Sequence, residues 1–162
     1  IARPEQLAFQ QFLVIQPLAQ RELQLGRDLA FAHDHPHHLF LQILGPGHVL
    51  QMAFRLLGVK VGRTTWLNTT DLTEFDCVTI GDGAELNEHS GPQTHLFEDR
   101  VMRIGMVQIG ERATLGVRAT VLYDASVGEE CRLGPLTLVA KGEHTPARTS
   151  WEGTPSAPAP LN

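Results

Sequence analysis

The sequence predicts an all-β parallel solenoid, because two sets of residues, one aliphatic and one small, each recur with a period of six. Aliphatic residues recur at every sixth position through the second half of the chain, and a small residue directly follows most of them. Other small residues lie four positions after the first five of these aliphatics. The aliphatic column is Ile109, Leu115, Val121, Val127, Leu133 and Val139, and the small column is Ala113, Ala119, Ala125, Cys131 and Thr137.

A period of six fits neither the 3.6-residue turn of a helix nor the two-residue alternation of a strand. It fits a coil in which each six-residue step forms a short strand and a corner, and three steps complete a triangular turn. The aliphatic residue of each step then points into a shared interior, and the small residue fits where that interior narrows. A chance run of strands in an antiparallel sandwich is the alternative, and two matched columns argue against it.

The same unit continues upstream in weaker form, starting at Val61 and at Ile80. These two residues are nineteen positions apart, one more than three steps, which predicts a bulge within 72–78. Residues 91–106 carry no six-residue period, so a long loop must leave the second coil there. We expect about four coils between Val61 and Glu143, with one projecting loop.

The N-terminal third lacks the period and is predicted to be helical. Residues 4–24 have a helix-like pattern that Pro17 interrupts. A second helix is expected at 49–57, with Val49, Met52, Ala53, Leu56 and Leu57 on one stripe. This helix would cover the open end of the coil, whose strand edges would otherwise be unpaired. We therefore predict a helical segment and connector at 1–58, a β-helix at 59–146 and a tail at 147–162.

Composition excludes several classes of function. The 162 residues fit one globular domain, and a net charge of −5 argues against a nucleic-acid partner. No apolar run reaches the roughly 18 to 20 residues of a membrane span. We expect a cytoplasmic protein that is at most peripheral to a membrane.

Two of the three settings in which histidines occur carry no predicted role. The tract that contains His33, His35, His37 and His38 lies between predicted helices without nearby cysteines, so we interpret it as a solvated connector. His48 and His144 stand singly at the ends of predicted elements, where histidines are more often caps or surface residues.

His89 and His95 differ, because they lie at the base of the projecting loop, where function concentrates on a rigid scaffold. An imidazole titrates near neutrality and can remove a proton from an attacking amine or hydroxyl. Glu98 or Asp99 would then orient the ring of His95 and stabilise its charged form. The alternative, equally supported by the residues, is a hydrogen bond of His95 within the loop beside a structural ion-pair cluster of Glu98, Asp99 and Arg100.

Three strings of the chain carry a narrower resemblance. They are TDLTEFDCVTIGD at 70–82, QTHLFEDRVM at 93–102 and VLYD at 121–124. These strings are similar to the C-terminal acyltransferase-like domains of nonribosomal peptide synthetases of the poly-epsilon-lysine synthetase type. The six-residue repeat itself resembles the left-handed parallel β-helix of the hexapeptide-repeat acyltransferases.

The resemblance implies a left-handed coil and an acyltransferase that forms amide bonds from a pantetheine thioester, carried by coenzyme A or by a phosphopantetheine carrier domain. It implies no other bound cofactor and no metal. His95 matches the loop histidine that acts as base at a cleft between neighbouring β-helices, in a homotrimer or in a pseudo-trimer within one chain.

Two other functions remain open. A catalytically silent β-helix would serve as a scaffold or oligomerisation module beside an active copy. The gamma-class carbonic anhydrases share the fold and hold a metal with three histidines, but only His89 and His95 lie near the loop.

Overall fold

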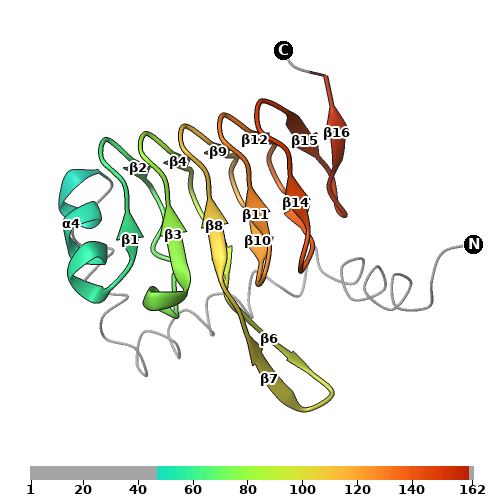
Figure 1. Ribbon diagram of the computed structural model, residues 1–162, viewed down its shortest axis with the longest axis horizontal. Helices are drawn as coiled ribbons and strands as arrows, with labels where there is room; N and C mark the ends of the chain where they lie inside the picture. Colours follow the sequence, from blue (N-terminus) through green and yellow to red (C-terminus); the bar gives the residue numbers. More distant parts are fainter. Residues whose placement is uncertain (1–46, 161–162) are drawn as a thin grey trace, which may run out of the picture. The chain divides into compact units, whose positions relative to one another are not determined.

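The structure, a computed structural model, describes residues 47–160, so the helix expected at 4–24 and the tract around His33, His35, His37 and His38 lie outside the described residues. Over this range the chain winds into a parallel β-helix with three sides (Figure 1). The first sheet consists of β1 (Lys60–Val61), β3 (Val78–Ile80), β8 (Val107–Ile109), β11 (Ser126–Val127) and β14 (His144–Thr145). The second consists of β2 (Trp66–Leu67), β4 (Glu85–Leu86), β9 (Thr114–Leu115), β12 (Arg132–Leu133), β15 (Ser150–Glu152) and β16 (Ala157–Ala159). The third consists of β5 (Gly91–Gln93), β10 (Thr120–Leu122) and β13 (Leu138–Val139).

Strand register stacks the predicted aliphatic residues in vertical columns, which confirms the solenoid. One column runs through the first sheet and another through the second, and both point into the interior. The first is Val61, Ile80, Ile109, Val127 and Thr145, and the second is Leu67, Leu86, Leu115, Leu133 and Trp151. The predicted small residues fill the corners between sheets and are all at most 2% exposed.

Glycine follows the aliphatic residue where successive coils approach most closely. A Cβ atom on Gly110 would lie 2.6 Å from the carbonyl carbon of Gly128 and 2.7 Å from the amide nitrogen of Glu129. Both atoms belong to the backbone of the next coil and have no freedom to move away. Hydrogen bonds between the stacked strands set the distance between coils, and the glycine column makes that distance possible.

The coil continues beyond the predicted boundary at 146. Residues 147–162 were expected to form a tail, but β15 adds a rung to the second sheet, and β16 then pairs with β15 in antiparallel fashion. The sequence pattern concealed this rung because the two column positions after Val139 are Thr145 and Trp151, which are not aliphatic. Thr145 nevertheless is 3% exposed, and Trp151 packs against the core.

Both predicted departures from the period are present. The extra residue expected within 72–78 corresponds to a single 3₁₀ turn, η1 (Phe75–Cys77), on the irregular third side of the first coil. The projecting loop is a β-hairpin of β6 (His95–Glu98) and β7 (Val101–Ile104), which leaves the coil after β5. Asp99 and Arg100 form its two-residue turn with φ of 50° and 65°, the left-handed values that a tight hairpin requires.

The predicted cap is helix α4 (His48–Leu57), which packs against β1, β2 and η1 at the end of the coil (Figure 1). Its buried residues are Leu50, Gln51 and Phe54. The expected stripe was wrong in its direction, because Val49, Met52 and Leu56 point to solvent. Within residues 47–160, no helix is long and apolar enough to cross a bilayer.

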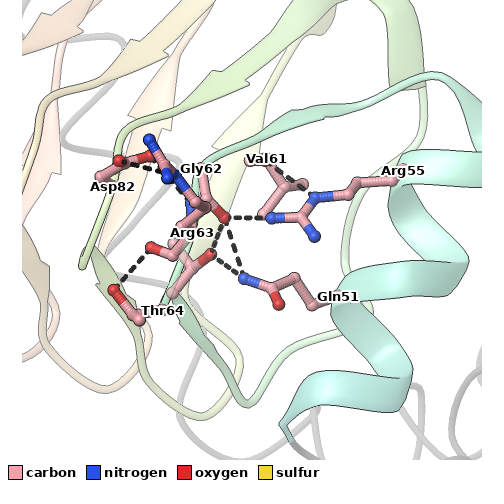
Figure 2. A network of polar contacts seen from close by, with 8 residues as sticks. Gln51, Arg55, Val61, Gly62, Arg63, Thr64 and Asp82 are labelled. Atoms are coloured by element: carbon pink, nitrogen blue, oxygen red, sulfur yellow. Dashed lines mark hydrogen bonds and ion pairs between the residues drawn. The ribbon is translucent and has the colours of Figure 1, made fainter.

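Polar contacts explain why a glutamine lies on the buried side of α4 (Figure 2). The amide of Gln51 donates to the carbonyl oxygen of Gly62 at 2.9 Å and to the hydroxyl of Thr65. The guanidinium of Arg55 donates to the carbonyl oxygens of Val61 at 3.0 Å and Gly62 at 2.5 Å. These bonds satisfy polar groups at the open end of the first coil, as a cap must.

The orientation of α4 predicts that two leucines of the same helix respond very differently to truncation. Leu50→Ala should lower the free energy of unfolding by about 2 to 5 kcal/mol, because the side chain is 2% exposed and leaves a cavity. The matched variant Leu56→Ala should change it by no more than about 0.5 kcal/mol, because Leu56 is 87% exposed. Urea unfolding of both variants measures the difference, and equal losses would contradict this orientation.

Candidate active site

His95 is the first residue of the hairpin, at the point where the chain leaves the third sheet. The preceding Thr94 is fully buried, and its carbonyl oxygen accepts a hydrogen bond from the amide of Gly105 at 2.9 Å. This bond closes the base of the hairpin. The imidazole is therefore attached to a rigid part of the coil, although the hairpin itself projects from it (Figure 1).

The carboxylate beside His95 is Glu74, which lies immediately before η1 on the irregular side of the first coil. One of its oxygens, Oε2, is 2.9 Å from Nδ1 of His95. The same oxygen accepts hydrogen bonds from the hydroxyl of Thr73 at 2.6 Å and from that of Thr94. Three groups from two successive coils thus converge on one carboxylate oxygen.

The electrostatics of this cluster favour an ionised Glu74. Partial burial acts to raise the pKa of the carboxyl group, but hydrogen bonds from Thr73, Thr94 and His95, together with the attraction of the imidazole, lower it below its usual value of 4.5. The side chains of His95 and Glu74 are only 22% and 21% exposed. An ionised carboxylate at Nδ1 holds the proton on that nitrogen, so Nε2 carries the lone pair that can accept another.

The sequence led us to expect Glu98 or Asp99 beside His95. The structure shows that this prediction was wrong, because neither carboxylate contacts the imidazole. Glu98 lies three residues along β6, on the opposite face of the hairpin, because successive side chains of a strand alternate. Its oxygens contact Nζ of Lys141 at 2.6 Å, the hydroxyl of Tyr123 at 3.2 Å and Nε of Arg103 at 3.3 Å. Asp99 is in the turn at the tip of the hairpin.

Glu98 instead fastens the hairpin to the coil. The salt bridge with Lys141 lowers the pKa of Glu98 and raises that of Lys141. Lys141 follows β13 in the fourth coil, so the contact joins the face of the hairpin opposite His95 to its own β-helix. This arrangement fixes the direction of β6 and, with it, the position of His95.

The other face of the hairpin carries His95 among exposed apolar side chains. Register pairs His95 with Ile104 and Phe97 with Met102, which places all four side chains on one face. Phe97 is 72% exposed, Ile104 53% and Met102 41%. The rings of His95 and Phe97 meet edge to face, with their centroids 6.2 Å apart. An apolar ridge thus leads along the hairpin to the imidazole.

Glu74 was not predicted as a site residue, because the six-residue period does not lead to it from His95. A Cβ atom on Gly91 would be 3.2 Å from the carbonyl oxygen of Asp71, so these residues stack in successive coils twenty positions apart. The same offset from Thr94 leads to Glu74. Glu74 lies 21 positions before His95, whereas one coil plus the predicted extra residue is 19 positions and leads to Asp76, so the period alone would not have found this carboxylate.

The remaining described histidines lie apart from this cluster. Nδ1 of His89 is 3.5 Å from Oδ2 of Asp71, and its other ring nitrogen is 3.7 Å from Glu88. His89 also borders an open depression of about 390 Å³ at another corner of the coil. His144 shares a hydrogen bond of 2.8 Å with the hydroxyl of Ser126. No group of three or more His, Cys, Asp or Glu side chains within residues 47–160 is arranged to hold a metal ion.

Sequence comparison identifies a similar segment in a much larger protein. No family model matches the chain. Delta-poly-L-ornithine synthetase from Acinetobacter baumannii is 50% identical to it over 119 residues. This stretch is 74% of the present chain but only 9% of the synthetase, so the chain corresponds to a small part of that protein.

Structural comparison finds the same fold in solved acyltransferases. A hexapeptide-repeat acetyltransferase from Vibrio cholerae has a TM-score of 0.55 at 17% identity, over 64% of this chain and 62% of that chain. A variant of an N-acyltransferase from Bacillus cereus, in complex with dTDP and coenzyme A, has a TM-score of 0.50 at 12% identity, over 73% and 91% of the two chains. Together with the stacked columns, these findings confirm the expected fold, a left-handed parallel β-helix with the hexapeptide repeat, and the expected resemblance to acyltransferase-like domains of peptide synthetases.

Proposed function

We propose that the domain transfers an acyl or aminoacyl group from a pantetheine thioester to an amine, with His95 as general base and Glu74 as the residue that positions it. The contact of 2.9 Å between Oε2 of Glu74 and Nδ1 of His95 carries this proposal. A general base needs a fixed ring, a defined tautomer and a partner for the charge that it acquires. Glu74 provides all three.

In the proposed reaction the amine nitrogen attacks the thioester carbonyl carbon while Nε2 of His95 removes the amine proton. The carbon–sulfur bond then breaks, and the same proton passes from the imidazolium to the departing thiolate. The ionised Glu74 stabilises the imidazolium between these steps. Backbone N–H groups at a coil edge would hold the negative charge on the carbonyl oxygen.

Two comparisons support the choice of donor. The Bacillus cereus neighbour was solved with coenzyme A, and the Acinetobacter baumannii relative is a synthetase. Coenzyme A and a carrier domain present the same pantetheine arm, so either would offer the thioester to His95. The apolar ridge of Phe97, Met102 and Ile104 forms one wall for that arm. A neighbouring β-helix, in a homotrimer or a pseudo-trimer within one longer chain, would supply the opposite wall.

Replacing His95 tests the proposed base. His95→Asn keeps an amide N–H near the position of Nδ1 for Glu74 but removes the basic nitrogen. We expect this variant to lose about 10² to 10⁴ of the rate of acyl transfer while its melting temperature stays close to that of the native chain. The assay follows amide formation from aminoacyl-pantetheine and aminoacyl-coenzyme A with a primary amine.

His144→Ala is the matched control, because the ring of His144 bonds only to Ser126 among the described residues and the variant should retain full activity. An active His95→Asn variant would refute the base. If the native chain transferred no acyl group from either donor, the domain would instead be a catalytically silent scaffold.

The coupling between His95 and Glu74 can be measured with a double-mutant cycle. Glu74→Gln alone should lower kcat about tenfold or more, because the amide cannot stabilise an imidazolium. In the His95→Asn background the same change should cost almost nothing, since the residue acts only through the base. Glu85→Gln, an exposed substitution on the second sheet, is the control. Additive losses would show that Glu74 does not act through His95.

The lowered pKa of Glu74 also predicts a pH dependence of stability. A carboxyl group whose pKa is lower in the folded state stabilises the fold above its usual value of 4.5 and loses that contribution as the pH falls through the lowered value. The native chain should therefore exceed Glu74→Gln in stability at neutral pH, and the difference should shrink in acid. Urea unfolding at a series of pH values measures it, and a constant difference would contradict the network.

A further inference from the structure

Thr94 has a hydroxyl group that is shut off from water. The residue is 0% exposed, whereas the side chains of Glu74 and His95 are 21% and 22% exposed. A hydroxyl that water cannot reach must find its acceptor within the protein. Two groups lie within hydrogen-bond distance of this hydroxyl: Oε2 of Glu74, and the hydroxyl oxygen of Thr73 at 3.3 Å.

The protons of the cluster fit an ionised Glu74. A hydroxyl carries a single proton, and a carboxylate is a stronger acceptor than another hydroxyl. Thr73, whose hydroxyl is 2.6 Å from Oε2, and Thr94 therefore both donate to the carboxylate. The N–H at Nδ1 of His95 completes the set. A protonated Glu74 would add another donor and weaken the acceptor that all three groups share.

The backbone of Thr94 is fixed independently of Glu74. Its carbonyl oxygen accepts from the amide of Gly105 at 2.9 Å, and the preceding strand β5 pairs with β10 in the third sheet. Threonine is branched at Cβ, which restricts the rotation of its side chain. Glu74, in contrast, lies in the irregular segment just before η1. The coil thus holds the donor, and the carboxylate aligns to it.

We propose that Thr94 is a positioning residue, whose buried hydroxyl holds Oε2 of Glu74 against Nδ1 of His95. The inference rests on the proposed function, because it names the group that aligns the partner of the general base. Without this hydroxyl the carboxylate can rotate away from the imidazole, so proton transfer slows. Substrate binding does not change, because Thr94 has no exposed surface with which to touch the donor or the amine.

Replacing the hydroxyl by a methyl group tests this role. Thr94→Val keeps the branched shape of the side chain and removes the donor. We expect kcat to fall about fivefold to tenfold, as for residues coupled in one hydrogen-bond network, while KM for the thioester and for the amine stays at the native value. Thr94→Ser returns the hydroxyl and should restore kcat. The assay is amide formation from aminoacyl-pantetheine with a primary amine.

Thr137→Val is the matched control for the loss of a buried hydroxyl. Thr137 is 1% exposed, and its hydroxyl donates to the carbonyl oxygen of Trp151 at 3.4 Å, outside the cluster of His95. This variant should keep the native kcat, whatever the change in its melting temperature. Thermal unfolding followed by circular dichroism, measured for both valine variants, separates a loss of stability from a loss of positioning.

A double-mutant cycle shows whether Thr94 acts through Glu74. In the Glu74→Gln background, Thr94→Val should lower kcat very little, because the ionised carboxylate that the hydroxyl positions is already absent. A residue with a merely structural role would lower kcat by the same factor in both backgrounds.

A titration of Glu74 tests the contact without any assay of acyl transfer. The hydroxyl of Thr94 favours the ionised carboxylate, so its removal should raise the pKa of Glu74. The titratable groups beside this carboxylate are His95, and Asp76 and Cys77 in η1, and Thr94→Val leaves them in place. NMR of isotope-labelled glutamate carboxyl carbons follows the titration, and the signal that Glu74→Gln removes identifies Glu74.

Four results would overturn the inference. Thr94→Val would turn over at the native kcat, Thr94→Ser would lose as much as Thr94→Val, the loss would be the same in the Glu74→Gln background, or the pKa of Glu74 would stay unchanged in Thr94→Val. A native chain that transferred no acyl group would refute the proposed function instead. The titration alone would then decide whether Thr94 holds Glu74.

Discussion

The close approach of successive coils is the constraint on which the rest of the structure depends. Backbone hydrogen bonds hold successive rungs at one spacing, which leaves no room for even a methyl group at Gly81 and Gly110. With that spacing fixed, the residues one coil apart become neighbours, whatever their type. This is how Glu74, Thr94 and His95 come together from two different coils.

The sequence predicted the parts of the fold that repeat and the places where the repeat fails. The six aliphatic residues from Ile109 to Val139 are enough to predict the repeating fold, because only a coil with six residues per side buries all of them in one interior. It did not predict which face of α4 is buried, because one of the buried residues, Gln51, is polar. Its side-chain amide is buried without loss of hydrogen bonding, since it donates to the carbonyl oxygen of Gly62. It missed Glu74 for a related reason: the stacking partner of His95 lies on an irregular side, where no column marks the register.

The hairpin has two faces with opposite tasks. The face that carries Glu98 bonds to Lys141 and Tyr123 of later coils of the same β-helix, and these contacts hold the direction of β6. Its apolar face stays exposed and carries His95. The sequence brought Glu98 and His95 into one short string, which made them look like partners. The alternation of side chains along a strand separates them, so proximity in sequence was a poor guide to proximity in space.

The reversal of direction at β16 has a consequence for the exposed edge of the second sheet. Every other strand of the second sheet is parallel to its neighbours, and an uncovered last rung would be a template on which identical chains could assemble into fibres. β16 runs the opposite way, and Pro158 at its centre, flanked by Pro155 and Pro160, lacks the amide hydrogen that an incoming strand would need. Proline thus leaves this edge of the second sheet without a donor for a further strand.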